Sequence, residues 1–304
     1  MRDFNNYFKE EFSNDIELTL PISIQIELTE NCNFSCPFCY NNSIKKESQI
    51  FDINKWKSLL YSIINQGGVF QCAFSGGEPL LYKDELLQLF DILHEDKTGL
   101  MLMTNGYYLD ESYIKKLCKY KWYWIQISLD SHKSAIHDSI RGIQGSYVRV
   151  INAIKNLNSY NLPVVISSVI CKKNIHDIEG LVKLANKLNV KMILFSPVLP
   201  VGRGKTNGAL QLDKKEYLEY CSEIEKVSKK YTKIIVKSAQ SYENQINNTN
   251  SLPPLGVLIR PNGDVKTDCI SNEIVGNVFK MSLNTIWKKI IKEKRWKNIY
   301  EKNL

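Results

Sequence analysis

The sequence lacks three features that mark other classes of protein. It has no run of 18 or more uncharged apolar residues, so no transmembrane helix is expected. Its first residues, MRDFNNYFKEEF, do not have the basic, apolar and small-residue order of a signal peptide, which makes the cytoplasm the default expectation. It contains no zinc-finger, homeodomain or RNP-type signature, so a nucleic-acid partner is not expected. With 304 residues, 43% of them apolar, the chain is expected to form one large soluble domain or one domain with an appendage.

Cysteine is comparatively abundant, with eight residues in the chain. In a chain expected to be cytoplasmic, this number favours metal or redox chemistry over disulfide bonds.

Basic residues concentrate at the C-terminal end, although the whole chain has a net charge of only +8. Residues 280–304 contain eight Lys or Arg side chains against Glu293 and Glu301, which gives this segment a net charge of +6. Such a run is typical of a solvated helix face. The alternative is that it attracts an acidic partner, either a peptide or a nucleic acid.

Short apolar runs alternate with segments of helical period between residues 22 and 196. The runs predict six strands, near residues 22–28, 69–74, 99–104, 122–129, 164–170 and 191–196. The intervening segments predict helices over residues 53–64 and 86–93 and near 110–119, 146–160 and 175–188. The first of these helices has Asp52 as its expected cap and Gly67-Gly68 as its expected end. This alternation predicts parallel strands, in either an open doubly wound sheet or a partial (β/α) barrel, and both place ligands at the carboxyl ends of the strands.

The pattern changes after Pro197. Residues 238–254 are rich in Ser, Asn and Gln and predict a loop. Beyond it we expect a short strand, a tight turn at residues 261–264, a second strand and a final amphipathic helix. One face of that helix carries Leu283, Ile286, Trp287 and Ile290.

Three cysteines, Cys32, Cys36 and Cys39, stand close together directly after the first predicted strand. Thiolates are soft ligands that favour iron–sulfur clusters or zinc. A closed zinc site needs four ligands, and no histidine is close in sequence, since the four stand at positions 94, 132, 137 and 176. A [4Fe-4S] cluster normally takes four cysteines, so three would leave one iron open to a substrate. The alternative is that the three are ordinary buried thiols.

The C-x3-C-x2-C spacing after the first strand, with an aromatic residue at Phe38, resembles the radical S-adenosylmethionine (radical SAM) superfamily. The resemblance covers about residues 20–200. It implies an α/β fold, a partial (β/α)6 barrel with a small α+β C-terminal extension. It also implies two cofactors, one [4Fe-4S] cluster on Cys32, Cys36 and Cys39 and S-adenosyl-L-methionine (SAM).

A second match follows the second predicted strand, where Gly76, Gly77, Glu78 and Pro79 resemble the GGEP motif of the family. Two glycines allow the backbone to approach a ligand closely. The resemblance implies that exposed carbonyls and Glu78 hold the methionine ammonium of SAM. Taken alone, the Gly-Gly pair predicts only a turn.

Two later strands also end in residues that resemble family elements. Thr104 and Asn105, followed by glycine, resemble the TNG element at the end of the third strand. Ser128 and Asp130 resemble the SLD element at the end of the fourth, near the ribose and carboxylate of SAM. Asp130 could equally cap the next helix.

The remaining cofactor contacts are implied by weaker matches. Arg141, followed by glycine, is similar to an RG pair of the family and is implied to bind the methionine carboxylate through a forked ion pair. The segment from Ser196 to Leu199, after the sixth strand, is implied to contact adenine through its backbone.

The C-terminal segment resembles a SPASM or twitch extension, which occurs in radical SAM enzymes that mature peptides or build cofactors. In those relatives it binds auxiliary clusters through a series of cysteines. Here no cysteine follows Cys269, and Leu252, Pro253 or Pro254 holds the position expected before the hairpin. We therefore expect a degenerate extension without auxiliary clusters. The expected organisation is a lead segment over residues 1–20, the radical SAM barrel over 21–200 and the extension over 201–304.

The other cysteines are scattered along the chain. Cys118 and Cys221 fall on expected helices and are predicted to be packed thiols. Cys72 on a strand and Cys171 at a strand end could each give a hydrogen atom to a substrate radical, and Cys171 is our candidate for this catalytic role.

These features predict an oxidoreductase-type enzyme that cleaves SAM reductively and removes a hydrogen atom from an unreactive C–H bond. The C-terminal resemblance favours a peptide substrate, a RiPP-type precursor undergoing crosslinking, epimerisation or a related change, with flavodoxin or ferredoxin as electron donor. One alternative is a radical SAM enzyme acting on a small molecule or nucleotide in cofactor biosynthesis. Another is a non-catalytic Fe-S sensor or peptide-binding protein.

Overall fold

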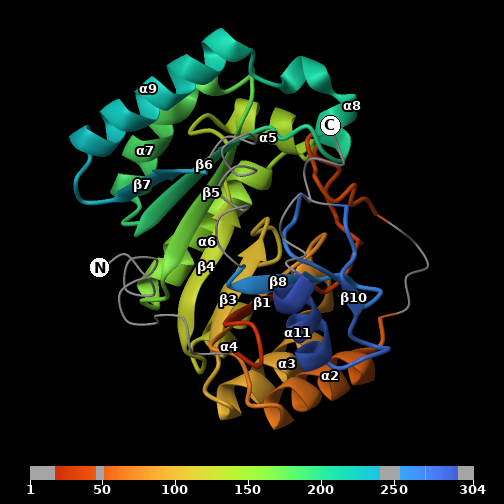
Figure 1. The fold of residues 1–304 in the computed structure, drawn as a ribbon. Helices are drawn as coiled ribbons and strands as arrows, with labels where there is room; N and C mark the ends of the chain where they lie inside the picture. Colours follow the sequence, from red (N-terminus) through yellow and green to blue (C-terminus); the bar gives the residue numbers. More distant parts are fainter. Residues whose placement is uncertain (1–17, 46–50, 240–253, 271, 294–304) are drawn as a thin grey trace.

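One curved sheet organises the chain. The computed structural model describes residues 18–45, 51–239, 254–270 and 272–293. Within these ranges, ten strands form a single sheet in the order β10-β9-β8-β1-β2-β3-β4-β5-β6-β7 (Figure 1). In chain order they are β1 (Ser23–Glu27), β2 (Gln71–Ser75), β3 (Gly99–Thr104), β4 (Trp122–Ser128), β5 (Val164–Ile170), β6 (Met192–Pro197), β7 (Ile235–Ser238), β8 (Gly256–Ile259), β9 (Asp264–Lys266) and β10 (Gly276–Asn277).

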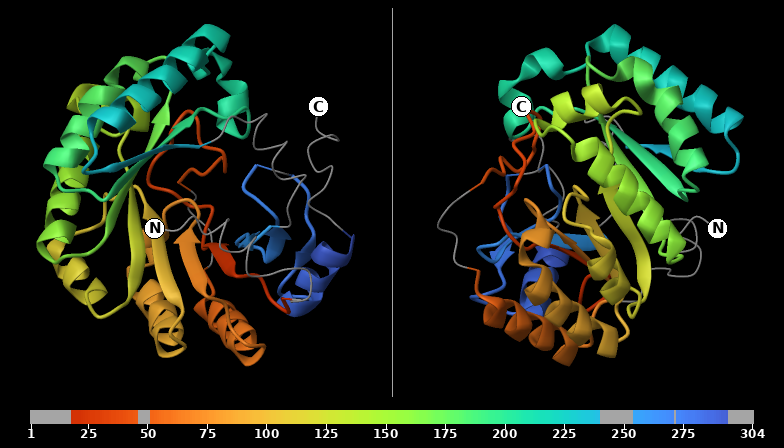
Figure 2. Two further views of the ribbon diagram at one scale, coloured as in Figure 1. Left: turned by 60° about the vertical axis from the view of Figure 1, so that its left-hand side comes forward. Right: turned by 180° about the vertical axis from the view of Figure 1, so that it is seen from behind.

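The six predicted strands are confirmed as β1 to β6, which pair in parallel and in sequence order. Helices follow them as right-handed crossovers require. They are α2 (Ile53–Asn65), α3 (Lys83–Glu95), α4 (Glu111–Leu117), α5 (Ser134–Arg141), α6 (Ser146–Ser159), α7 (Ile178–Lys187) and α9 (Lys214–Lys230). Figure 2 shows the sheet curved as an open barrel wall with helices on its outer side. The parallel α/β fold is therefore as predicted.

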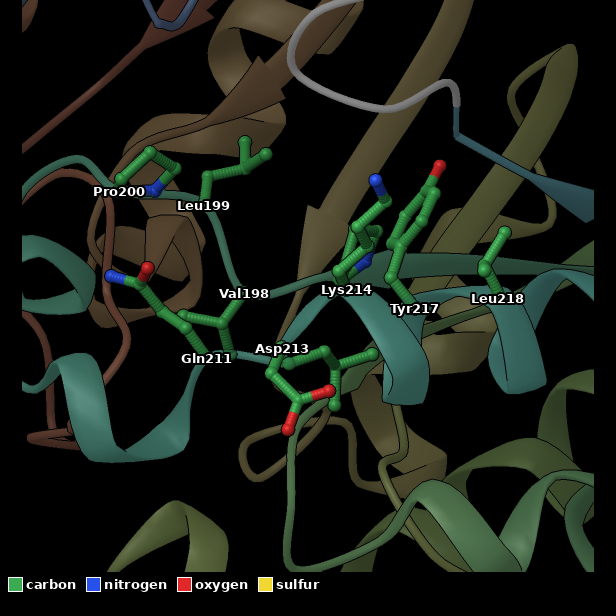
Figure 3. A pocket seen from close by; sticks show the side chains of 10 residues that line it. Val198, Leu199, Pro200, Gln211, Asp213, Lys214, Tyr217 and Leu218 are labelled. Atoms are coloured by element: carbon green, nitrogen blue, oxygen red, sulfur yellow. The ribbon is translucent and has the colours of Figure 1, made fainter.

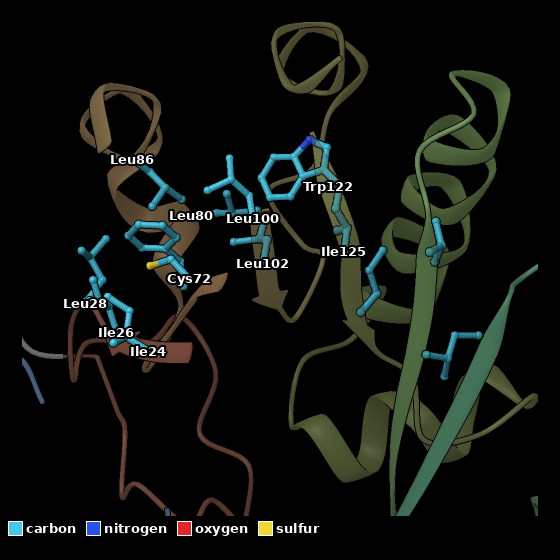
Figure 4. Packing of buried hydrophobic residues seen from close by; sticks show 14 of the residues in the cluster. Ile24, Ile26, Leu28, Cys72, Leu80, Leu86, Leu100, Leu102, Trp122 and Ile125 are labelled. Carbon is cyan, nitrogen blue, oxygen red and sulfur yellow. The ribbon is translucent and has the colours of Figure 1, made fainter. Parts of the chain in front are cut away.

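The core lies between the sheet and these helices. Alternate residues of each strand point outward, so β1 contributes Ile24 and Ile26 and β3 contributes Leu100 and Leu102 to one buried cluster (Figure 4). The apolar stripe of α2 packs onto the same cluster through Trp56, Leu59, Leu60 and Ile63.

Local signals at the ends of α2 act as predicted. The Asp52 carboxylate accepts a hydrogen bond from the Asn54 N–H at 3.0 Å, which satisfies one of the free donors of the first turn. The helix ends just before Gly67, whose φ of +114° few other residues adopt.

The elements of the first 240 residues that were not predicted include α5 and β7. The helix α5 has the sequence SAIHDSIR, and its buried residues include His137 and Arg141, so its apolar pattern is weak. The strand β7 pairs in parallel with β6 at the edge, and most of its residues are exposed.

The expected C-terminal hairpin and helix are present. β8 and β9 pair antiparallel across the turn containing Gly263, which has a φ of +86°. The predicted apolar face of α11 (Leu283–Glu293) is buried. The indole N–H of its Trp287 donates to the Leu18 carbonyl at 2.9 Å, which holds the helix against the start of the barrel.

The C-terminal hairpin continues the barrel sheet, because β8 pairs in parallel with β1. The boundary near residue 200 therefore stays a prediction. The predicted loop over 238–254 lies almost wholly outside the described residues, and so do residues 1–17 of the lead segment, Leu252 and Pro253. No helix in the described ranges is both long and apolar enough to span a membrane.

Candidate functional site

The three clustered cysteines lie on a loop at the carboxyl end of β1. We call residues 32–43 the cluster loop. Cys32 and Cys36 are buried and Cys39 is half-buried. Cys32 and Cys36 belong to a buried apolar patch, and Cys39 packs against it; the patch also contains Phe34, Phe38, Ile140, Cys171 and Val198. The ends of β1, β5 and β6 and the helix α5 thus meet around the thiols, as the parallel topology predicts.

The donor set fits an iron–sulfur cluster. Burial raises the pKa of Cys32 to about 12, and the negative charge of Glu78 adds to that rise. Burial likewise raises the pKa of Cys36. Because burial disfavours the thiolate forms of Cys32 and Cys36, these soft sulfur ligands need a cationic partner to ionise, and cluster iron would supply it. Among the described residues, no three His, Cys, Asp or Glu side chains have the spacing needed to bind a single metal ion.

The two glycines of the GGEP segment pack against the residues that lead into the cluster loop. The Gly77 N–H donates to the Thr29 carbonyl at 2.7 Å. A Cβ atom added to Gly77 would lie 2.0 Å from the Asn31 carbonyl oxygen, and one on Gly76, whose φ is +127°, would lie 2.5 Å from the Thr29 oxygen. The close approach that these glycines allow is therefore to the chain's own backbone. Their contact with SAM stays a prediction.

Glu78 is fully buried and holds the ends of β2 and β3 together. Its carboxylate accepts hydrogen bonds from the Leu80 N–H at 3.0 Å, the Thr104 hydroxyl at 2.7 Å and the Asn105 N–H at 2.8 Å. Burial nevertheless raises its pKa to about 7. Pro79 opens the short helical turn η1 (Pro79–Tyr82) directly behind it. Three protein donors already occupy the carboxylate, and its contact with the methionine ammonium stays a prediction.

Asn105 connects Glu78 to the cluster loop. Its side-chain amide donates to the Asn33 side-chain oxygen at 2.8 Å and accepts from the Tyr107 N–H at 3.0 Å. The residues of the TNG element thus position the loop between Cys32 and Cys36.

Arg141 and Asp130 form a buried pair behind the cluster loop. The Arg141 Nε and Nη2 atoms lie 2.6 and 2.8 Å from the two Asp130 carboxylate oxygens. Arg141 Nη1 lies 3.7 Å from the Cys36 sulfur, and the guanidinium lies 5.4 Å from the centre of the Phe38 ring. The Asp130 carboxylate also accepts from the Val169 N–H at 2.9 Å. The guanidinium fork that would bind the methionine carboxylate is therefore occupied, and that role stays a prediction.

The alternative role of Asp130 as a helix cap is wrong. The helix α5 begins after Lys133 without a side-chain cap, because the Asp130 carboxylate turns toward Arg141 instead. The backbone N–H of Asp130 donates to the Nδ1 atom of buried His137 at 3.2 Å, and burial lowers the pKa of His137 to about 4.

Three further predicted residues lie around the same end of the sheet. Ser128 is half-buried at the end of β4. Cys171 follows β5, is fully buried in the patch with Cys32 and Cys36, and has a pKa raised by burial, so it is a neutral thiol. Leu199 lines a cavity of about 570 Å³ between the end of β6 and the start of α9 (Figure 3).

Three scattered cysteines are not placed as predicted. Cys118 and Cys221 are exposed, because the buried faces of α4 and α9 lie on other residues. Cys72 is fully buried in the core between the sheet and the helices (Figure 4), so it cannot reach a substrate on the other side of the sheet. Cys269 is exposed beside the C-terminal hairpin.

Two contacts of the cluster loop were missed in the sequence. In the first, buried Glu27 accepts from the Tyr40 hydroxyl at 2.9 Å and pairs with Arg260 at 2.7 Å. Arg260 also reaches Glu30 at 3.1 Å and donates to the side-chain oxygen of Asn41, so the residue after β8 contacts both the chain that leads into the loop and the later part of the loop. An acidic residue at the end of an apolar strand was the available signal. The second contact is made by Arg203, whose guanidinium donates to backbone carbonyls of the loop. The sequence gives no sign of it, because Arg203 stands between two glycines in a segment that resembles an ordinary surface loop.

Comparisons with known proteins agree with this geometry. Residues 26–185 match the family model of the Radical SAM superfamily. The subtilosin biosynthesis protein AlbA of Bacillus subtilis is 26% identical over 292 residues, which cover 93% of this chain and 63% of AlbA. The sporulation killing factor maturation protein SkfB of B. subtilis is 28% identical over 209 residues, covering 68% of this chain and 50% of SkfB.

Solved structures show the same fold. SuiB of Streptococcus suis, in its complex with the precursor peptide SuiA, superimposes with a TM-score of 0.71 at 18% identity, covering 89% of this chain and 65% of SuiB.

This chain spans half to just under two thirds of the length of AlbA and SkfB. More than half of its residues match the superfamily model, and so the chain belongs to the radical SAM superfamily, whose enzymes use a [4Fe-4S] cluster and SAM.

Proposed function

We propose that this radical SAM enzyme modifies a peptide, removing a hydrogen atom from an unreactive C–H bond during peptide maturation. The observation that carries the proposal is the nature of its relatives. AlbA is named for the biosynthesis of the bacteriocin subtilosin and SkfB for maturation of a killing factor. The fold is also shared with SuiB, whose structure contains a precursor peptide. The wide sequence coverage of AlbA, 93% of this chain, supports a peptide over a small molecule.

Cys32, Cys36 and Cys39 would hold the cluster. When bound, the reduced cluster would supply one electron for the cleavage of a C–S bond of SAM, which gives methionine and a 5′-deoxyadenosyl radical. The protein's own part is to position and to exclude water. Glu78 and Asn105 fix the loop before Cys36 through the hydrogen bonds described above, and the apolar patch around Phe38 keeps water from the thiols.

The proposed SAM-binding residues surround this patch at the carboxyl ends of the strands. They are Phe38, Gly76, Gly77, Glu78, Pro79, Thr104, Asn105, Ser128, Asp130, Arg141 and Leu199. The cavity beside Leu199 supports the adenine contact, because Val198 both lines it and belongs to the cysteine patch. Cys171, a neutral buried thiol in the same patch, is the proposed hydrogen-atom donor.

Two further parts of the proposal concern the electron donor and the C-terminal extension. Flavodoxin or ferredoxin is the proposed electron donor. Residues 201–304 are proposed to form a degenerate SPASM or twitch extension that holds no auxiliary cluster.

The test uses anaerobically reconstituted protein with dithionite and SAM, and it measures 5′-deoxyadenosine by chromatography. Synthetic peptides with the sequences of short reading frames beside the gene serve as probes. We expect one of them to increase 5′-deoxyadenosine formation several-fold and to change mass, while the Cys36→Ala variant does neither. Consumption of a small molecule with no mass change in any peptide would contradict the peptide proposal. A protein that holds a cluster but never cleaves SAM would contradict an enzymatic role.

A further inference from the structure

A short segment after β6 makes several hydrogen bonds to the cluster loop. We call residues 202–207, which include the one-turn helix α8 (Arg203–Thr206), the clamp segment. Figure 1 shows α8 beside the chain that follows β1. Its contacts join residues 160 to 170 positions apart in the sequence, so only the fold brings them together.

Arg203 makes three hydrogen bonds to the cluster loop, all to backbone carbonyls. Its Nε–H donates to the Cys36 carbonyl at 2.7 Å, and its Nη2–H donates to the Ser43 carbonyl at 2.9 Å. Its backbone N–H donates to the Cys39 carbonyl at 3.0 Å. One residue therefore fixes the loop at its second cysteine, at its third cysteine and near its end. The planar fork of a guanidinium can span two such acceptors, whereas a lysine ammonium cannot hold both in the same geometry.

The neighbours of Arg203 in the clamp segment support this arrangement. The Asn207 side-chain amide donates to the Pro37 carbonyl at 2.8 Å. Gly202 has a φ of +53°, and a Cβ atom there would lie 2.3 Å from the Tyr40 carbonyl oxygen and 2.4 Å from that of Cys39. The two backbones thus touch where only glycine fits, which brings Arg203 within reach of the loop.

The electrostatic surroundings of the Arg203 guanidinium differ from those of Arg141. Within the described residues no carboxylate lies within ion-pair distance of the half-buried Arg203 guanidinium. Arg141, on the other side of Cys36, is by contrast paired with Asp130. Adding an electron to a cluster adds negative charge, and an uncompensated cation nearby stabilises that reduced form.

We propose that Arg203 is a positioning residue that holds the cluster loop in its ligand-bearing shape and raises the reduction potential of the cluster. The proposal rests on the cluster site at Cys32, Cys36 and Cys39, and it is independent of the identity of the substrate. Reduction takes one electron from an external donor, which is dithionite in the experiment below, and breaks no bond in the protein.

The experiment compares Arg203→Lys, Arg203→Gln and the control Lys205→Gln. Lys205 lies on the same helical turn, is exposed and forms no side-chain hydrogen bond or ion pair with the described residues 32–43, so its substitution removes the same charge without removing the fork. Three quantities are measured. They are the rate at which iodoacetamide alkylates Cys39 in the cluster-free protein, the rate at which a chelator removes iron from the loaded protein, and the midpoint potential of the cluster. Alkylation of exposed Cys118 in the same sample serves as the internal reference.

We expect both Arg203 variants to show alkylation of Cys39 and loss of iron roughly tenfold faster than the wild type, because each loses the forked contacts. The midpoint potential should fall in Arg203→Gln and stay near the wild-type value in Arg203→Lys, which keeps the charge. Lys205→Gln should resemble the wild type in all three measurements.

Wild-type alkylation and iron-loss rates in Arg203→Gln would overturn the positioning role. An unchanged potential in that variant would overturn the electrostatic role. If Arg203→Gln does not fold, Asn207→Ala removes the exposed hydrogen bonds to the Pro37 and Arg203 carbonyls and should still raise the rate of iron loss. No change there would overturn the clamp. A wild-type protein that modifies no peptide leaves these measurements unaffected, so failure of the proposed substrate is distinguishable from failure of the clamp.

Discussion

The N-terminal and C-terminal halves of the chain hold the cluster loop in different ways. On the N-terminal side, Gly77 packs backbone against backbone, and the fully buried carboxylate of Glu78 orients Asn105 beside the loop. On the C-terminal side, long cationic side chains reach in from half-buried positions, with Arg203 on the loop carbonyls and Arg260 on Glu27.

This difference has a physical origin. A glycine at a backbone contact and a buried acid with three donors tolerate almost no substitution, because any Cβ clashes and any lost acceptor leaves buried donors unpaired. An arginine at a half-buried carbonyl can be weakened in steps. Substitutions on the N-terminal side should therefore abolish the site, and those on the C-terminal side should tune it.

The largest effect is expected at the loop itself, where both halves converge. Wild-type protein reconstituted anaerobically should contain about four irons per chain, the content of one [4Fe-4S] cluster. Cys36→Ala should lose the cluster absorbance and all SAM cleavage, because two thiols cannot retain it. Iron analysis and 5′-deoxyadenosine formation measure both. Reproducible loading near eight irons would show instead that the C-terminal half carries a second cluster.

Gly77→Val tests the N-terminal side of the comparison. The family resemblance alone predicts that this variant keeps its iron and loses only SAM binding. The structure changes that expectation, because the added Cβ would lie 2.0 Å from the Asn31 carbonyl oxygen, next to Cys32. We expect loss of most of the iron as well as of SAM binding, measured by iron analysis and by calorimetric titration with SAM.

The control is Gly208→Val, at a position where a Cβ atom meets nothing within 4 Å. It should load iron and bind SAM as the wild type does. If Gly77→Val keeps four irons per chain, the backbone contact with Asn31 does not position the cluster loop.

The pattern of what the sequence predicted follows the same division. The strands, the cysteine spacing and the GGEP and TNG segments could be predicted, because local periodicity and local motifs encode them. Arg203 and Arg260 could not, since their partners lie 160 or more positions away and an arginine between glycines carries no local pattern. The prediction that Cys118 and Cys221 are packed thiols was wrong for a related reason. Their helices were expected, but the face that each helix buries depends on the sheet beneath it.

The pH dependence of the free energy of unfolding, compared between wild type and Glu78→Gln, tests the N-terminal side further. The folded pKa of Glu78 is raised by burial from its ordinary value of 4.5 to about 7. The folded protein therefore binds this proton more tightly than the unfolded chain. The resulting stabilisation is complete below pH 4.5 and is lost as the pH rises through about 7, by an amount on the order of 3 kcal/mol.

The measurement is urea unfolding of cluster-free protein at pH 5 and pH 8. Wild-type protein should lose more free energy of unfolding between these values than Glu78→Gln, because glutamine does not titrate. Comparing the two proteins cancels the contributions of all other groups. Equal changes in the two proteins would mean that Glu78 titrates near its ordinary pKa. The contacts of Glu78 would then tolerate substitution as well as those on the C-terminal side.

The smallest effect is expected at the basic surface of α11, on the C-terminal side. Its apolar face is buried, while Lys288, Lys289 and Lys292 are exposed. Exposed charges are screened beyond about 8–10 Å at ordinary ionic strength, so they steer a partner without holding it. Changing all three lysines to Gln should weaken binding of the peptide substrate a few-fold at low salt. It should leave the rate of SAM cleavage without peptide unchanged. Fluorescence anisotropy with the labelled peptide at two salt concentrations measures this.

The matched control changes the exposed Lys183, Lys187 and Lys191, which lie around the end of α7, to Gln and alters the net charge equally. Equal weakening in both triple variants would mean that only the total charge matters. Unchanged affinity in the α11 variant would mean that its lysines form a solvated helix face, and the C-terminal half would then act on the cluster loop through Arg203 and Arg260 alone.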